Sequence, residues 1–272
     1  MLWLIANGSI AERLEFLPPV YSTAKRVRYN PSMSLADRRR AIRHLLDSQK
    51  SADARATYYA FHHPDKRTSL ITHLPNTARA TGYICLSRTG LDLFRPLMTM
   101  RLPTGDMLAT LDLIYSALPV GASVLMSASM HDMPMIRATF DIERESVTHV
   151  LALDRGRYEP IINVLVTSEG ERNGLPRMVI RRDGETVASA NVNWRSEKFA
   201  EINVTTSPKH RRQGWGRSVV AGLCGRLLES GVRPIYVVSA ENRASIKLAE
   251  SVGFIDTGAR SVFLEATLKP RP

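Results

Sequence analysis

The feature that most constrains the fold is a strand, a glycine-containing loop and a helix in direct succession between residues 201 and 231. Apolar or β-branched residues alternate at Ile202, Val204 and Thr206, which predicts a strand. After the loop, apolar residues recur at helical spacing before a stop at Gly231; they are Val219, Val220, Leu223, Leu227 and Leu228. This order places several backbone N–H groups at the positive end of a helix dipole, which suits a phosphate.

The loop itself is basic and contains two glycines. Its sequence is Arg211-Arg212-Gln213-Gly214-Trp215-Gly216-Arg217. Glycine has no Cβ atom, so the main chain can approach a ligand closely and can adopt positive φ angles. The three arginines supply charge for a polyanion. The stretch therefore predicts a site for a ligand that carries phosphates.

This loop resembles the phosphate loop of the GNAT family of N-acyltransferases. The family pattern is Arg or Gln, two residues, Gly, one residue, then Gly or Ala, and it fits Arg211 to Gly216, with Pro208 upstream. A later segment, from Asn242 to Phe254, also matches: Asn, a small residue, Leu and a closing Gly-Phe follow a predicted strand at 233–239. The resemblance covers residues 177–266 and implies an α/β fold with a mixed, mostly antiparallel sheet flanked by helices.

Glycine and proline gather in residues 156–176, which we expect to be a linker. We therefore expect an N-terminal domain at 1–155 and a GNAT acetyl-CoA-binding domain at 177–272. The second domain opens with a hairpin turn at Asp183-Gly184.

The N-terminal domain is expected to mix helices and strands. Helices are predicted after Ser34, where Asp37 can complete a capping box, and after Asp106. The remaining expected elements are strands at 57–61, 82–86, 97–102, 123–127 and 147–153, and a short helix at 133–140.

The same order of elements occurs in the two halves of the chain. Ser127-Ala128-Ser129-Met130 stands 112 residues before Ser239-Ala240-Glu241-Asn242. At that spacing Leu102 and Thr104 occupy the two glycine positions, so the phosphate signature is missing. Residues 50–153 are then either a degenerate GNAT-like copy in tandem or similar by chance. The C-terminal unit lacks room for the two helices that wall the acceptor site in GNAT proteins. We therefore expect the N-terminal domain to be acceptor-side or structural.

The resemblance also assigns cofactor contacts and a reaction. It implies that Val204, Thr205 and Thr206 lie along pantetheine, and that the loop at 211–217 and Asn242 complete the cofactor site. A strand N–H near the thioester carbonyl would act as an oxyanion hole. Transfer to the acceptor amine is direct, so no protein nucleophile is required.

Two proton-transfer roles remain to be assigned. The resemblance suggests Glu201 as the base, with an exposed structural glutamate as the equal alternative. The family's usual acid is a Tyr seven residues after the Asn, where this chain has Ala249, which cannot donate a proton. Ser245 is then the candidate acid. Otherwise a water serves, or the thiolate leaves unassisted, since a thiol pKa is about 8.5.

Charge and composition restrict the function classes further. The formal net charge is +11 and is spread along the chain, which suits a polyanionic cofactor and also permits weak nucleic-acid affinity. The run Arg38-Arg39-Arg40 is expected to be a solvated basic face, with a nucleic-acid contact as the alternative. The apolar start, Met1–Ala6, is too short for a signal sequence, and no 18-residue apolar run exists, which favours a cytoplasmic protein without membrane contact. Cys85 and Cys224 are expected to be buried and reduced.

The leading prediction is an acyltransferase that moves an acetyl group from acetyl-CoA to a primary amine of a small molecule or peptide. No metal is expected, because His62, His63 and His73 have no third ligand at a recognisable spacing. One alternative is a non-catalytic acyl-CoA-binding module, favoured by Ala249. The other is a nucleic-acid-associated protein, which the charge permits and which we rank last.

Overall fold

The computed structural model describes residues 33–75, 79–172 and 174–272, so the stretch Met1–Ala6 lies outside the described residues. The helices are α1 Leu35–Ile42, α2 Ala54–Thr57, α3 Met107–Ala117, α4 Met133–Thr139, α5 Trp215–Glu229 and α6 Arg243–Val252. The strands are β1 Thr68–His73, β2 Gly82–Ser87, β3 Leu97–Arg101, β4 Ser123–Ser129, β5 Phe140–Leu153, β6 Val166–Arg172, β7 Leu175–Arg182, β8 Glu185–Arg195, β9 Phe199–Thr206, β10 Arg233–Ser239 and β11 Phe254–Leu268.

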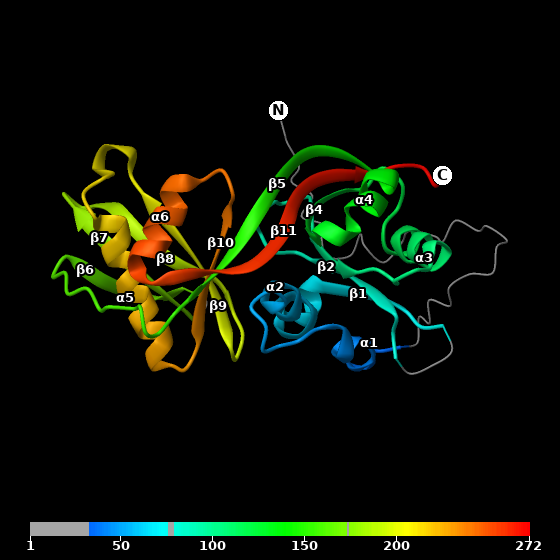
Figure 1. Cartoon of the computed structure of the whole chain (residues 1–272), viewed down its shortest axis with the longest axis horizontal. Helices are drawn as coiled ribbons and strands as arrows, with labels where there is room; N and C mark the ends of the chain where they lie inside the picture. The colour runs from blue at the N-terminus through cyan, green and yellow to red at the C-terminus, as the bar shows by residue number, and fades with distance from the viewer. Residues whose placement is uncertain (1–32, 76–78, 173) are drawn as a thin grey trace, which may run out of the picture.

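All of these strands join one sheet in the order β1-β2-β3-β4-β11-β5-β10-β9-β8-β7-β6. Neighbours are antiparallel except for two parallel pairs, β3 with β4 and β9 with β10. Helices flank the sheet (Figure 1), which confirms the predicted mixed, mostly antiparallel α/β architecture.

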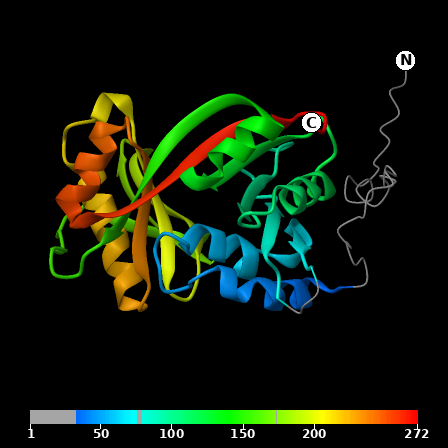
Figure 2. The ribbon, with the colours of Figure 1, turned by 45° about the vertical axis from the view of Figure 1, so that its right-hand side comes forward.

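Strands β5 and β11 are long and run between the two halves of the molecule, as both views show (Figures 1 and 2). Ser261–Thr267 of β11 pair with β4, so the last strand of the chain completes the N-terminal half of the sheet. Thr148–Ala152 of β5 pair with β10 and complete the C-terminal half. Each half therefore contains a strand from the other.

The two halves repeat the same sequence of elements. In the first, α3, β4, α4 and β5 follow one another, and in the second α5, β10, α6 and β11 do so. Each half has one parallel strand pair next to the exchanged strands.

Alternation along the strands separates three apolar cores. In β2 and β3, Cys85 and Leu97 face α1 and α2, whereas Ile84 and Met98 face α3 and α4. A third core lies under α5 and α6 in the C-terminal half. The core under α1 and α2 also contains Trp194, Phe199 and Ile235 from the C-terminal half, so this core is shared by both halves.

Several predicted elements are confirmed. Ser34 caps α1: its hydroxyl accepts a hydrogen bond from the Asp37 N–H and donates one to the Asp37 carboxylate. The Asp106 carboxylate caps α3, and Asp183-Gly184 joins β7 to β8. Cys85 and Cys224 are free and fully buried, and burial raises the pKa of the Cys85 thiol to about 11.

The predicted strand at 57–61 is wrong. α2 continues there as a π-helical turn, Tyr58–His62. Aromatic residues favour a strand locally, but here Tyr59 lies in the shared core and Tyr58 stacks on Trp194 with ring centroids 5.0 Å apart. Contacts with a residue far away in the sequence thus override the local preference. Strand β1 was not predicted, and β6 lies within the expected linker.

The expectation of a solvated face at Arg38-Arg39-Arg40 is also wrong for two of the three residues. Arg38 is buried and donates to the Leu70 carbonyl at 2.7 Å. Arg39 donates to the Ala60 carbonyl at 2.8 Å and pairs with Asp65 at 2.7 Å. These guanidinium groups attach α1 to β1 and to the turn after α2. The run therefore presents no continuous basic patch to a nucleic acid.

No helix in the described part of the chain is long and apolar enough to cross a membrane.

Candidate active site

The glycine loop lies between the end of β9 and the start of α5. Gly214 is the residue before the helix and has φ 77°, a left-handed conformation that disfavours side chains. Arg212 also has a positive φ, 61°. The turn leads directly into a 15-residue helix whose first N–H groups have no partner within the helix. This geometry suits an anion at the N-terminus of α5.

Gly216 has a different role from Gly214. A Cβ atom on Gly216 would lie 2.9 Å from Leu248 Cδ1 and 3.1 Å from Thr206 Oγ1. The missing side chain therefore lets the first turn of α5 pack closely against α6 and the end of β9. Gly214 has nothing within 4 Å of its Cβ position, so only its backbone conformation requires glycine.

The polar residues of the loop are turned outward. Arg211, Arg212, Gln213 and Arg217 are exposed, and the Arg217 Nε also donates to the Ser251 carbonyl at 3.1 Å. Trp215 is half-buried and stacks on His210, with ring centroids 5.3 Å apart. The loop thus offers positive charge to solvent beside the helix N-terminus.

Strands β9 and β10 separate shortly after they begin. Their parallel pairing covers Phe199 to Glu201 opposite Arg233 to Ile235 and then stops. Beyond it, Val204, Thr205 and Thr206 remain paired with β8 on their other side. The β10-facing edge of this part of β9 therefore has backbone groups with no partner in the sheet.

Asn242 and Ser245 begin α6. The Asn242 Oδ1 accepts a hydrogen bond from the Ser245 N–H at 3.1 Å and so caps the helix. The Ser245 Oγ lies 2.7 Å from the Tyr236 hydroxyl, which is on β10. Burial raises the pKa of Tyr236. Ala249 is fully buried. Tyr236 lies outside the family motifs and was missed by the sequence reasoning.

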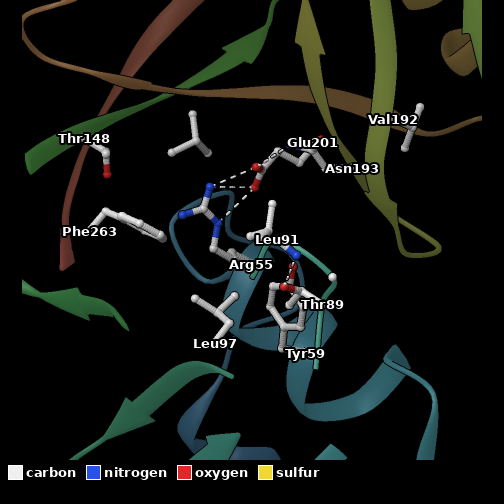
Figure 3. Close-up of a pocket in the computed structure, with 12 residues that line it drawn as sticks. Arg55, Tyr59, Thr89, Leu91, Leu97, Thr148, Val192, Asn193, Glu201 and Phe263 are labelled. Atoms are coloured by element: carbon white, nitrogen blue, oxygen red, sulfur yellow. Dashed lines mark hydrogen bonds and ion pairs between the residues drawn. The ribbon is translucent and has the colours of Figure 1, made fainter. Parts of the chain in front are cut away.

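Glu201 is buried, not exposed, with 6% of its surface accessible. Its carboxylate accepts hydrogen bonds from Arg55 Nε at 3.0 Å and Nη2 at 2.9 Å. Asn193 Nδ2 and Trp194 Nε1 each donate to it at 3.0 Å. These donors occupy about the four acceptor positions that a carboxylate has. Figure 3 shows Arg55 and Glu201 facing each other.

A β-bulge explains how two consecutive residues reach one carboxylate. The register between β8 and β9 shifts between Val192 and Trp194. In a regular strand, neighbouring side chains point to opposite faces, but a bulge reorients them locally. Asn193 and Trp194 can therefore both donate to Glu201. Arg55 itself carries no signal in the sequence, because an arginine on a short helix is usually a surface residue.

Glu201 lies in the wall of a cavity of about 450 Å³ between the two halves. The N-terminal half contributes Arg55 and Tyr59 from the α2 region, and the other lining residues are Thr89, Gly90, Leu91, Leu97, Thr148, Val192, Asn193, Val237 and Phe263 (Figure 3). Arg55 and Glu201 are the charged members of this lining, and they pair with each other. The charges of this lining therefore balance, and its other members mix apolar residues with the polar Tyr59, Thr89, Thr148 and Asn193.

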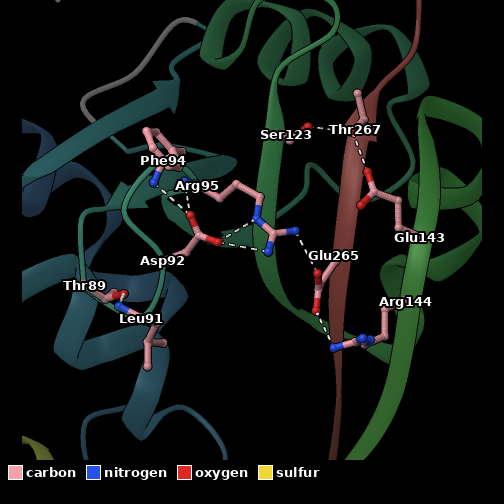
Figure 4. A network of polar contacts seen from close by, with 10 residues as sticks. All are labelled: Thr89, Leu91, Asp92, Phe94, Arg95, Ser123, Glu143, Arg144, Glu265 and Thr267. Atoms are coloured by element: carbon pink, nitrogen blue, oxygen red, sulfur yellow. Dashed lines mark hydrogen bonds and ion pairs between the residues drawn. The ribbon is translucent and has the colours of Figure 1, made fainter.

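The loop beside the cavity is fixed by an ionic network (Figure 4). Arg95 pairs with Asp92 at 2.9 Å and with Glu265 on β11 at 2.8 Å. Glu265 also pairs with Arg144 on β5 at 3.0 Å. The loop that supplies Thr89 and Leu91 is thus attached to the two exchanged strands.

The GNAT acetyltransferase family model matches residues 168–263. No curated protein shows significant sequence similarity to the chain.

Three solved structures share the fold over most of the chain. A Drosophila protein is 14% identical, with TM-score 0.59, over 87% of this chain and 89% of its own. A GCN5-related N-acetyltransferase from Sphaerobacter thermophilus is 12% identical, with TM-score 0.58, and the match covers 88% of this chain and 95% of that one. A tandem GNAT protein from the clavulanic acid biosynthesis pathway is 11% identical, with TM-score 0.55, and the match covers 88% of this chain and 96% of that one. At these identities the similarity concerns the fold. The similarity in sequence to GNAT acetyltransferases thus lies in the domain at residues 168–263.

Proposed function

We propose that the protein transfers an acetyl group from acetyl-CoA to a primary amine. One observation carries this proposal: β9 connects the two sites that the reaction needs. Its end leads into the glycine loop, its unpaired edge runs from Ile202 to Thr206, and Glu201 lies in the wall of the cavity. A donor bound along this edge would bring its thioester close to an acceptor in the cavity.

The residues of the loop fit the pyrophosphate of coenzyme A. The exposed Arg211, Arg212 and Arg217 supply charge, and the N-terminus of α5 supplies N–H donors. The unpaired edge at Val204, Thr205 and Thr206 supplies backbone groups for the amides of pantetheine. In the reaction, the amine nitrogen attacks the thioester carbonyl carbon and the C–S bond breaks. A strand N–H would stabilise the oxyanion that forms in between.

The N-terminal half supports the proposal by closing the acceptor side. Arg55 and Tyr59 cover the face of the C-terminal sheet opposite α5 and α6. We propose that this half, within residues 1–155, is a degenerate GNAT-like unit joined through 156–176 to the acetyl-CoA domain at 177–272. At its own strand-to-helix turn the Asp106 carboxylate caps α3, accepting from the Ala109 N–H at 2.9 Å. A negative charge at that helix N-terminus disfavours phosphate.

The proton that leaves the amine is proposed to pass to water. The Glu201 carboxylate already has four donors, so accepting a further proton would require one of them to move. Glu201 then positions Arg55, Asn193 and Trp194, and its action as a base remains the alternative. On the other side, Ser245, hydrogen-bonded to Tyr236, is proposed to protonate the departing thiolate.

The test is thermal unfolding with and without acetyl-CoA, together with turnover on a panel of amines. Acetyl-CoA at about 100 times its Kd adds about 2.7 kcal/mol of stability, and the midpoint should rise by a few degrees. Gly214→Val should abolish this rise. Gly121→Val is the matched control, because Gly121 also has a positive φ, 82°, and open space around its Cβ position. A rise without turnover on any amine would favour a non-catalytic acyl-CoA-binding module. No rise with any acyl-CoA would refute the proposal.

A further inference from the structure

Arg55 has donor capacity beyond its pair with Glu201. A guanidinium group carries five N–H donors in a fixed planar arrangement. Nε and Nη2 face the Glu201 carboxylate, whereas Nη1 makes a contact of 3.5 Å with Ser127 Oγ, at the limit of a hydrogen bond. Figure 3 shows the third guanidinium nitrogen turned away from Glu201. The second edge of the group, Nη1 with Nη2, therefore keeps donor capacity that the pair with Glu201 does not use.

We propose that the acceptor is an amino acid, and that this second edge of Arg55 binds its carboxylate. The inference rests on the proposed function and specifies its acceptor. A carboxylate fits an arginine edge through two parallel charge-assisted hydrogen bonds. Because the pair with Glu201 uses the other edge, the acceptor can bind without breaking it.

The charge balance of the cavity supports this assignment. Arg55 and Glu201 neutralise each other, so the lining has no surplus charge for an ion. A plain alkylammonium ion would bring a charge that no group of the lining compensates into a partly buried space, which is costly. A zwitterion is neutral overall. Its carboxylate would meet Arg55, and its ammonium would lie on the side of the cavity that β9 opens toward the donor.

The apolar part of the lining offers a place for an apolar side chain. Leu97, Val237 and Phe263 surround the space next to Arg55, and Leu91 closes it from the loop. On the same loop, Leu93 and Phe94 are 90% and 92% exposed. The volume of about 450 Å³ falls within the usual range for small-molecule sites.

A second cavity, of about 360 Å³, also contains Arg55 and lies beside the separation of β3 and β4. Its other inner arginine, Arg101, is bonded to Asp53 and to the Met100 carbonyl. Arg101 therefore provides a matched control for Arg55, since both are partly buried and ion-paired.

The first experiment varies the acceptor and leaves the protein unchanged. The first series is leucine, leucinamide and 3-methylbutylamine, which share one apolar group and differ in whether they carry a carboxylate. The second series, phenylalanine, phenylalaninamide and phenethylamine, repeats the comparison. Binding is measured by calorimetry and turnover with acetyl-CoA. We expect binding and kcat/KM to be about 10- to 100-fold stronger for the free acids, the range for hydrogen bonds to charged groups.

The second experiment uses Arg55→Lys, which keeps the charge opposite Glu201 and removes the planar second edge. The preference for the free acid should fall to about threefold or less, with the thermal shift by acetyl-CoA unchanged. Arg101→Lys should keep the full preference. If Arg55→Lys does not fold, the acceptor series on the native chain still decides.

Equal binding of acids, amides and amines would overturn the inference and leave the acetyltransferase proposal standing. The inference would also be overturned if the preference for the acid were lost in Arg101→Lys and kept in Arg55→Lys. If acetyl-CoA does not shift the unfolding midpoint, the proposed function is refuted. The carboxylate preference is measured separately, by calorimetry, so the two failures can be told apart.

Discussion

Glu201 illustrates how much one side chain's function depends on its neighbours. The strand position suggested a catalytic base, and in the fold this carboxylate joins the two halves through Arg55 and fixes the bulge through Asn193 and Trp194. The sequence could locate Glu201 on the central strand. It could not show that an arginine 146 residues away occupies its acceptor positions.

Glu201→Gln should destabilise the protein by about 3 kcal/mol, because it removes the counter-charge from the partly buried Arg55. The measurement is urea unfolding, with Glu265→Gln as the control for an ion-paired carboxylate that bridges strands near the surface. The pH dependence of kcat/KM separates the two roles. If the variant keeps its stability and loses the acidic limb of the profile, Glu201 is the base after all.

Ser245→Ala and Tyr236→Phe should each lower kcat by about 100-fold, a typical contribution of a general acid. Both variants should bind acetyl-CoA as the native protein does, because neither side chain belongs to the glycine loop. The comparison is made at saturating acetyl-CoA by steady-state kinetics. Native rates in both variants would mean that the thiolate leaves without an acid.

At the scale of single elements, prediction succeeded where the cause was local. Capping residues, the hairpin turn and the glycine loop depend on a few neighbouring residues, and they were correctly placed. The segment at 57–61 failed because its conformation depends on Trp194, which follows more than 130 residues later. The cavity was missed for the same reason, since its two charged residues come from different halves.

The first turn of α5 provides a prediction about packing. Gly216→Ala should cost about 1–3 kcal/mol, because the new methyl group would overlap Leu248 Cδ1 and press on Thr206. Shortening Leu248 to Ala creates space, so the double variant should lose less stability than the sum of the single variants. Urea unfolding of all four proteins gives the coupling. Strict additivity would show that the contact with Leu248 does not limit the approach of α5.

At the scale of the whole molecule, the two halves are joined by exchanged strands as well as by a shared core. The core under α1 and α2 includes Trp194, Phe199 and Ile235 from the other half, and β5 and β11 complete each other's sheets. The two proposed units, at 1–155 and 177–272, therefore share a core and a sheet across their boundary.

Fragments 1–155 and 156–272 should not fold when expressed separately. The first would lack β11 and expose the edge of β4, and the second would lack β5 and expose the edge of β10. Circular dichroism and proton NMR of each fragment, alone and after co-expression, measure this. Recovery of a folded complex on co-expression is expected. A dispersed spectrum from either fragment alone would contradict the prediction.

The position of β11 also determines when the protein can fold. Multidomain chains generally fold from the N-terminus as they leave the ribosome. Here the N-terminal sheet has a gap between β4 and β5 until the segment up to Leu268 has been synthesised. During translation the first half of the chain therefore stays incompletely folded, with the edges of β4 and β5 that β11 later covers still unpaired. A chaperone that shields exposed strand edges would find its substrate at this stage.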